Sequence, residues 1–164
     1  MDLYVLRHGI AEERKAGVPD RGRKLTPRGV RRMRKIAAAL YAVDVRVERI
    51  LTSPYERARR TASIVRKELG APVTVVTHLR PNGDPRRVID GLRTLGGRKG
   101  KMMIVGHEPM LSQIVSVLLT GSSAAAVPLK KGGLCKLAVN DLRYGKCASL
   151  EWFLTPRLLI SRLR

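Results

Sequence analysis

Arginine and histidine residues follow apolar segments of this sequence at the points where those segments end. They are Arg7 and His8 near the start, Arg57 after a Ser-Pro pair, and His107 in the second half of the chain. Such groups are costly to bury without partners. Two guanidinium groups offer forked N–H donors that match phosphoryl oxygens. The four residues therefore indicate a site for a phosphorylated ligand.

The same residues could carry out phosphoryl transfer. A neutral imidazole held in one tautomer can attack phosphorus, and a second imidazole can stabilise charge on the equatorial oxygens. Gly9 lets backbone approach the ligand closely. Helix starts expected near Ser53 and Glu108 would add backbone N–H donors for an anion, and the Ser53 hydroxyl is a candidate phosphate contact.

Apolar runs alternate with helical patterns along the chain, which determines where these residues meet. Strands are expected at 3–6, 47–51, 72–76 and 101–107. Helices are expected from Pro27 to 40 with Thr26 as N-cap, from Pro54 to Gly70, and over 84–95 and 108–119. In a parallel sheet, ligands bind outside the carboxyl ends of the strands. Three strand ends therefore deliver the two arginines and two histidines to one side.

The fold class predicted from this order is α/β. We expect a three-layer sandwich with a mostly parallel central sheet and helices on both faces. Residues 132–154 are expected to form a hairpin with a turn at 141–145, adding antiparallel or edge strands. The 164-residue chain is most simply a single domain, 1–164.

Composition favours a cytoplasmic protein without a membrane anchor. No apolar run reaches the roughly 18 residues that a membrane span needs, and the N-terminus lacks a signal-peptide pattern. Cys135 and Cys147 have no metal-like spacing and are expected to be free thiols. With only three histidines, the chain offers few candidates for a structural zinc site.

The net charge of +20 would attract anions, including phosphorylated substrates and nucleic acid. Aromatic residues make up only 4% of the chain, so stacking platforms for bases are scarce, and the basic residues are spread along the sequence. Both observations argue against a dedicated nucleic-acid module. A non-catalytic polyanion-binding module nevertheless stays open as an alternative, and the charge itself has no further explanation from the sequence.

Three segments resemble the histidine phosphatase superfamily, also called the phosphoglycerate mutase-like fold. They are "LRHGIAEE", "SPYERARRTASIV" and "VGHEPML". The short chain and the segments "LTPRG", "RPNGD" and "WFLTPRLL" are more similar to the SixA-type phosphohistidine phosphatase branch. The resemblance implies that His8 is the phosphoryl acceptor, that Arg7 and Arg57 bind phosphate, and that His107 completes the pocket. It also implies that no metal or cofactor takes part.

The sequence does not match the family at the position of the proton donor. Larger members have a glutamate after the third strand, but this chain reads "VVTHLRPNGDP" there. Asp84 and Glu108 are the candidates. Because the P–N bond of phosphohistidine is already labile, proton donation to its leaving group is less demanding than for an alkyl phosphate.

The resemblance implies hydrolysis of a phosphohistidine on a protein, through a phosphorylated His8. An open basic site without a long covering insertion suits a protein substrate, and phosphate, sulfate or similar anions are expected ligands. The alternative within the superfamily is a phosphatase of small phosphate esters.

Overall fold

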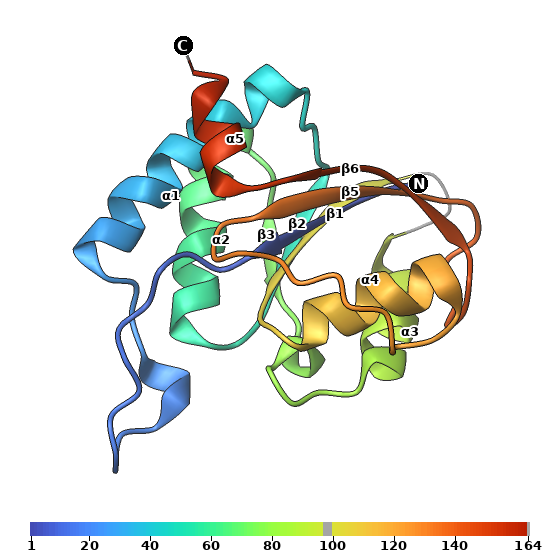
Figure 1. The fold of residues 1–164 in the computed structure, drawn as a ribbon, viewed down its shortest axis with the longest axis horizontal. Coiled ribbons are helices and arrows are strands. Elements are labelled where there is room, and N and C mark those ends of the chain that lie inside the picture. The colour runs from blue at the N-terminus through green and yellow to red at the C-terminus, as the bar shows by residue number, and fades with distance from the viewer. Residues whose placement is uncertain (97–99, 164) are drawn as a thin grey trace.

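A six-stranded mixed sheet forms the centre of the molecule, and helices cover both of its faces (Figure 1). The computed structural model describes residues 1–96 and 100–163. The strands are β1 (Asp2–Arg7), β2 (Arg49–Thr52), β3 (Val73–Val75), β4 (Lys101–Gly106), β5 (Leu134–Val139) and β6 (Ala148–Leu154). The helices are α1 (Pro27–Ala39), α2 (Glu56–Leu69), α3 (Pro85–Gly96), α4 (Met110–Thr120) and α5 (Pro156–Ser161). Short 3-10 helices are η1 (Asp20–Gly22), η2 (Tyr41–Val43) and η3 (Thr77–Leu79).

The strand order is β3-β2-β4-β1-β5-β6. β1, β2, β3 and β4 run parallel, whereas β5 pairs antiparallel with β1 and β6 pairs antiparallel with β5. The predicted α/β class is confirmed, including the C-terminal hairpin that supplies the antiparallel strands. Because β1 and β4 are central and neighbouring, their carboxyl ends meet in the middle of one edge.

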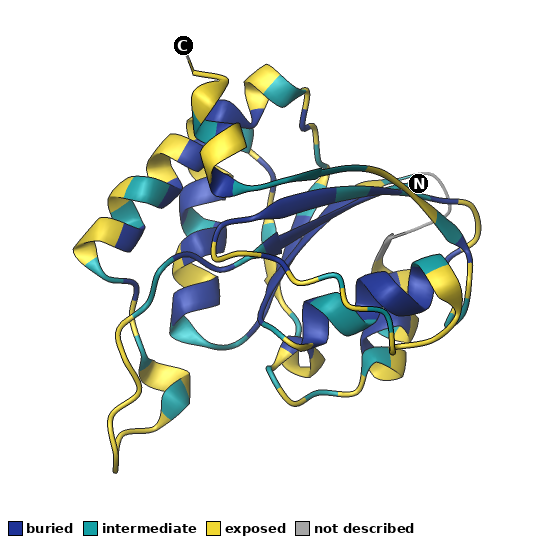
Figure 2. Cartoon of the chain, in the orientation of Figure 1, coloured by how far each residue is buried: buried dark blue, intermediate teal, exposed yellow. Residues whose placement is uncertain are grey.

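Alternation along β1 divides the core into two layers. Leu3 and Val5 face the cluster that contains α3 and α4 residues, whereas Tyr4 and Leu6 face the cluster that contains α1 and α2 residues. All four side chains are buried, as expected for a central strand covered on both faces. Figure 2 shows the inner strands as buried and the outer helix faces as exposed.

Helix boundaries follow the sequence signals where those are strong. Thr26 caps α1 by accepting a hydrogen bond from the Gly29 N–H, and Gly70 ends α2 in the left-handed region with φ of 71°. The short helix α5 was not among the predicted elements. Its six residues give too little periodicity to be recognised, although Thr155 caps it in the same way. Within the described part of the chain, no helix is both long enough and apolar enough to cross a membrane.

Candidate active site

The carboxyl ends of β1, β2 and β4 are joined by backbone hydrogen bonds. The His8 N–H donates to the Gly106 carbonyl at 3.1 Å, and the Ser53 N–H donates to the Val105 carbonyl at 3.1 Å. Residues that directly follow three different strands are therefore fixed relative to one another by main chain. The structure brings together the predicted residues Arg7, His8, Arg57 and His107 at this edge.

His8 is buried, and its tautomer follows from its partners. Its Nδ1 lies 2.7 Å from the Gly9 carbonyl oxygen, which can only accept, so Nδ1 carries the proton. Nε2 is then unprotonated and accepts a hydrogen bond from Arg57 Nε at 3.2 Å. The lone pair of Nε2 is thus directed into the site, beside a guanidinium group.

Arg57 lies in the first turn of α2 and is 3% exposed. Its terminal nitrogens donate to the carbonyl oxygen of Asp20 at 2.8 Å and to Asp20 Oδ2 at 2.9 Å. Asp20 belongs to η1, so a loop far away in sequence holds this arginine. Together with the Nε–H described above, three of the five guanidinium N–H groups of Arg57 are used, which leaves two for a ligand.

Gly9 is tied to the same helix. Its N–H donates to the Thr61 hydroxyl at 3.1 Å, and that hydroxyl donates to the Arg57 carbonyl at 2.7 Å. A Cβ at Gly9 would lie 2.5 Å from Met33 Cγ of α1, so a larger residue does not fit without displacement. The glycine therefore allows α1 to pack directly against the segment that carries His8.

Arg7 is positioned by a loop and an acid. Its Nη1 donates to the Leu129 carbonyl at 2.6 Å, and the Leu129 N–H donates to Glu108 Oε1 at 2.9 Å. Glu108 Oε2 accepts hydrogen bonds from both the N–H and the hydroxyl of Ser112. Glu108 therefore links the segment that positions Arg7, through Oε1, to Ser112 of α4, through Oε2.

His107 completes the cluster from the end of β4. Its ring centroid lies 4.9 Å from that of His8, and the ring of Tyr55 packs edge-on against it at 5.1 Å. His107 Nε2 lies 2.7 Å from the Ser53 hydroxyl, which also accepts from the Tyr55 N–H at 3.3 Å. Ser53 thus orients His107 and the start of α2, whose N-cap is Tyr55.

Both histidines are neutral at physiological pH in this arrangement. Burial, together with the charges of Arg57, Arg7 and Lys131, lowers the pKa of His8 to about 3 against the opposing effect of the Gly9 hydrogen bond. Burial also lowers the pKa of His107 to about 2, together with the charges of His8, Arg57 and Arg7. A neutral imidazole is the form that can attack phosphorus.

Two buried nitrogen atoms in the site have no hydrogen-bond partner among the described residues. They are Arg7 Nε and His107 Nδ1. Buried polar groups are nearly always paired, so such atoms indicate where a ligand belongs. With the free N–H groups of Arg57 they supply polar contacts from three strand ends, an arrangement suited to a tetrahedral oxyanion such as a phosphoryl group.

Comparison with known proteins identifies the family. Residues 3–81 match the model of the histidine phosphatase superfamily (branch 1). The phosphohistidine phosphatase SixA of Escherichia coli K12 is 31% identical over 144 residues, which cover 81% of this chain and 88% of that protein. The chain belongs to the histidine phosphatase superfamily. Within it, the chain falls in the SixA-type branch, as the sequence motifs indicated.

Two further similar proteins cover nearly the whole chain. A solved structure of the protein histidine phosphatase SixA complexed with tungstate superimposes with a TM-score of 0.82 at 26% identity, covering 96% of this chain and 98% of that one. An uncharacterized protein of Picosynechococcus sp. is 34% identical over 164 residues, covering 98% of this chain and 99% of that protein. Membership of the superfamily indicates that the chain is a phosphatase.

Two residues of this histidine phosphatase site were missed by the sequence reasoning. Asp20, the partner of Arg57, is the one acid between Glu13 and Asp44, and this isolation in a basic segment was the available signal. Thr61 follows Arg57 by four residues and occupies the same face of α2, but an interior helix threonine carries no distinctive pattern.

The two predicted proton donors lie in different settings. Glu108 accepts hydrogen bonds from Leu129 and Ser112, as described above. Asp84 is exposed, and its Oδ1 accepts from the Arg86 N–H at 2.9 Å, in the first turn of α3. The role of either carboxylate in proton transfer stays a prediction.

Proposed function

We propose that this protein is a phosphohistidine phosphatase that forms a phosphorylated intermediate on His8. The observation that carries the proposal is the hydrogen bond from His8 Nδ1 to the Gly9 carbonyl, which leaves the Nε2 lone pair as the nucleophile. The pKa of about 3 keeps that nitrogen unprotonated over the working pH range.

In the first step, Nε2 of His8 attacks the phosphorus atom in line with the leaving group. The N–P bond to His8 forms while the bond to the substrate imidazole breaks, and the bonding electrons leave with that imidazole. Arg7, Arg57 and His107 hold the three equatorial oxygens. The phosphoryl group takes the place of Arg57 Nε at the lone pair of His8.

In the second step, water attacks the phosphorylated histidine. A P–O bond forms, the P–N bond to His8 breaks, and inorganic phosphate is released with the neutral imidazole regenerated. Nδ1 of His8 keeps its proton throughout and donates it in the hydrogen bond to the Gly9 carbonyl. The proton for the first leaving group comes from Glu108, Asp84 or solvent, and the lability of the P–N bond makes this donation less demanding.

The substrate class is supported by likeness to SixA. The curated relative is named a phosphohistidine phosphatase, and the solved SixA structure contains tungstate, an oxyanion of phosphate-like shape. By extension, we propose that phosphate, sulfate and tungstate bind this site and that a phosphorylated protein is the substrate. No metal or cofactor is needed, because two arginines flank the nucleophile.

Trapping the intermediate tests the mechanism. Brief incubation with a peptide carrying ³²P-phosphohistidine, in the presence of EDTA, should leave an acid-labile and alkali-stable label on His8. The His8→Asn variant should acquire no label and lose turnover, whereas the exposed His78→Asn variant should behave as wild type. Label on another residue, or normal turnover by His8→Asn, would contradict the proposed mechanism.

Substrate preference is tested in the same preparation. The value of kcat/KM for the phosphohistidine peptide should exceed that for glycerate and sugar phosphates, since those esters have poorer leaving groups. A clear preference for one of the esters would favour a phosphatase of small phosphate esters instead. Absence of any turnover would favour the alternative of a non-catalytic polyanion-binding module.

A further inference from the structure

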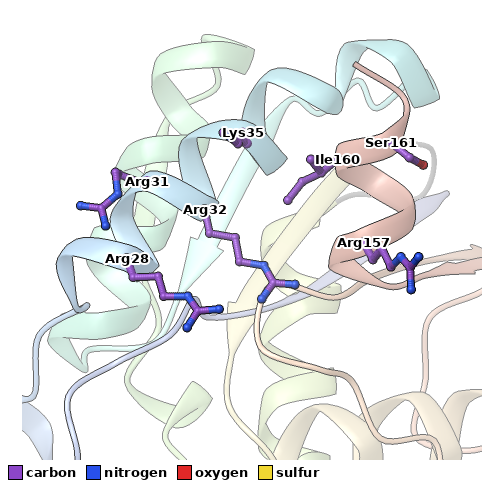
Figure 3. Close-up of a pocket in the computed structure, with 7 residues that line it drawn as sticks. All are labelled: Arg28, Arg31, Arg32, Lys35, Arg157, Ile160 and Ser161. Atoms are coloured by element: carbon purple, nitrogen blue, oxygen red, sulfur yellow. The ribbon is translucent and has the colours of Figure 1, made fainter. Parts of the chain in front are cut away.

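A basic groove lies between α1 and α5, apart from the four residues of the candidate active site (Figure 3). Its volume is about 720 Å³. We call it the α1–α5 groove, and it is lined by Arg28, Arg31, Arg32, Lys35, Arg157, Ile160 and Ser161. Figure 3 shows Arg28 and Arg32 extending to the same side, toward α5, whereas Arg31 extends the other way.

The charges of the groove are not balanced by acids. Its α1 cations include the pairs Arg28/Arg32 and Arg31/Lys35, each four residues apart, and the like charges of each pair repel one another. Two of them, Arg28 and Arg31, lie near the N-terminus of α1, where the helix dipole also disfavours cations. Over residues 1–96 and 100–163, none of the basic groove residues takes part in an ion pair.

Other basic hollows on this protein include an acidic residue in their lining. One on α2 contains Arg59, Arg60 and Arg66, and another near η1 contains Arg21 and Arg59, but Glu56 lines both. Among the residues that the structure describes, none of those lining the α1–α5 groove is acidic. Its uncompensated repulsion costs stability in the free protein, and an anionic partner would relieve it.

Gly132 lies between the end of β1 and the two helices that form the groove. The Gly132 N–H donates to the carbonyl oxygens of Arg7 and His8 at 3.0 and 3.2 Å. A Cβ at Gly132 would lie 2.7 Å from Ile36 of α1 and 3.7 Å from Pro156 of α5. The adjacent Lys131 is close enough to lower the pKa of His8. The turn that carries Gly132 therefore packs against α1 and α5 on one side and binds the end of β1 on the other.

We propose that the α1–α5 groove binds an acidic segment of the phosphoprotein whose phosphohistidine enters the candidate active site. This inference rests on the proposed function. Arginine guanidinium groups pair bidentately with glutamate and aspartate carboxylates, and Ile160 gives the groove an apolar contact for the aliphatic part of such a segment. No aromatic ring lines the groove, so bases of a nucleic acid would find no stacking platform there.

Kinetics with two synthetic peptides test the proposal. Each carries one phosphohistidine, and they differ only in a flanking run of glutamates or serines, with the spacing varied. Wild type should show a KM about tenfold lower for the best acidic peptide at low salt, and high salt should abolish the difference. The Arg28→Glu/Arg32→Glu variant should lose this preference while keeping its kcat/KM for the serine peptide.

A matched variant separates the groove from net charge. Arg87→Glu/Arg93→Glu reverses two exposed arginines on α3, on the opposite face of the sheet. Each double variant replaces two positive charges by two negative ones, which lowers the net charge from +20 to +16, and the α3 variant should keep the preference for the acidic peptide. Equal loss in both variants would overturn the groove as the binding site.

Binding without turnover keeps the test independent of the proposed function. Fluorescence anisotropy with the unphosphorylated acidic peptide should show binding to wild type and to the α3 variant, and about tenfold weaker binding to the groove variant. If neither peptide is hydrolysed yet this pattern holds, the proposed function fails and the groove stands as an acidic-peptide site. If the groove variant loses affinity for an RNA oligonucleotide but not for the peptide, nucleic acid is the partner and the proposal is wrong.

Discussion

At the residue scale, a small number of contacts convert ordinary side chains into a reactive set. The Gly9 carbonyl determines the tautomer of His8. Asp20 holds the guanidinium group of Arg57 by a hydrogen bond, and the Ser53 hydroxyl orients the ring of His107. The carboxylate of Asp20 is in turn affected: partial burial raises its pKa, but the hydrogen bond and charge of Arg57 and the charge of Arg23 outweigh this and lower it. The nucleophile and its flanking arginine are thus held before any ligand binds.

Glu108 gives the residue scale its testable prediction. Because both of its oxygens accept hydrogen bonds, Glu108→Gln removes one acceptor and frees the segment that contacts Arg7. We expect KM to rise several-fold and stability to fall by about 1–3 kcal/mol, with kcat and its pH profile unchanged. Steady-state kinetics across pH and urea unfolding measure these quantities.

A proton-donating role for Glu108 would give a different result. The kcat for phosphate esters with poor leaving groups would then fall by about 100-fold or more, and esters with good leaving groups would be spared. Asp84→Asn provides the comparison for the other candidate. Selective loss with either variant identifies that residue as the donor and contradicts a purely positioning role.

At the element scale, the site depends on how closely α1, α5 and β1 approach one another. Gly132 lies at this junction with φ of 82°, and its N–H binds the carbonyls of Arg7 and His8. Only glycine adopts this backbone region without cost, and a Cβ there would overlap Ile36 of α1. The turn before β5 therefore couples packing on the α1 side of the sheet to the position of His8.

Gly132→Ala tests this coupling. The left-handed conformation costs about 1–2 kcal/mol and the overlap about 1–3 kcal/mol more, so the free energy of unfolding should fall by about 2–5 kcal/mol. Turnover should fall as well, because the end of β1 is displaced. Gly17→Ala is the matched control, since Gly17 has a φ of 74° but nothing within 4 Å of a Cβ.

Thermal unfolding and kcat measure both effects. The control should lose only the conformational part, about 1–2 kcal/mol, with activity retained. Equal losses of stability in the two variants would mean that only the backbone conformation is responsible and that the contact with α1 does not contribute to stability.

The elements were more predictable from sequence than the contacts between them. Continuous apolar runs identified β1 and β4, and Thr26-Pro27 identified the start of α1, because these signals are local. The rule that strand ends converge predicted that Arg7, His8, Arg57 and His107 would meet. Asp20 and Leu129 were not predicted, because each contacts the site through a loop without periodicity. The short helix α5 was not predicted either, because it is too short to show a periodic pattern.

At the scale of the whole molecule, the positive charge and the neutral histidines are connected. A net charge of +20, with Arg7, Arg57 and Lys131 close to His8, opposes protonation of the buried imidazoles. The same field attracts phosphorylated substrates to the candidate active site and acidic segments to the α1–α5 groove. Burial is the largest cause of the lowered pKa of His8, and the charges that attract anions add to it.

This connection predicts how stability depends on pH. The pKa values of His8 and His107 are lowered to about 3 and about 2 in the folded protein, whereas the unfolded chain has ordinary values near 6.5. Between these limits the unfolded state binds more protons. Stability from each histidine is therefore fully present above pH ~6.5 and is lost as pH falls below it, by about 1.4 kcal/mol per pH unit per histidine.

Urea unfolding between pH 7 and pH 5 measures this slope in a range where most carboxylates stay ionised. Wild type should lose stability toward pH 5 with a slope approaching two protons, and His107→Asn or His8→Asn should each reduce the slope by about one proton. Single variants with an unchanged slope would show that these imidazoles are not held neutral by the fold, and the proposed state of the nucleophile would then be wrong.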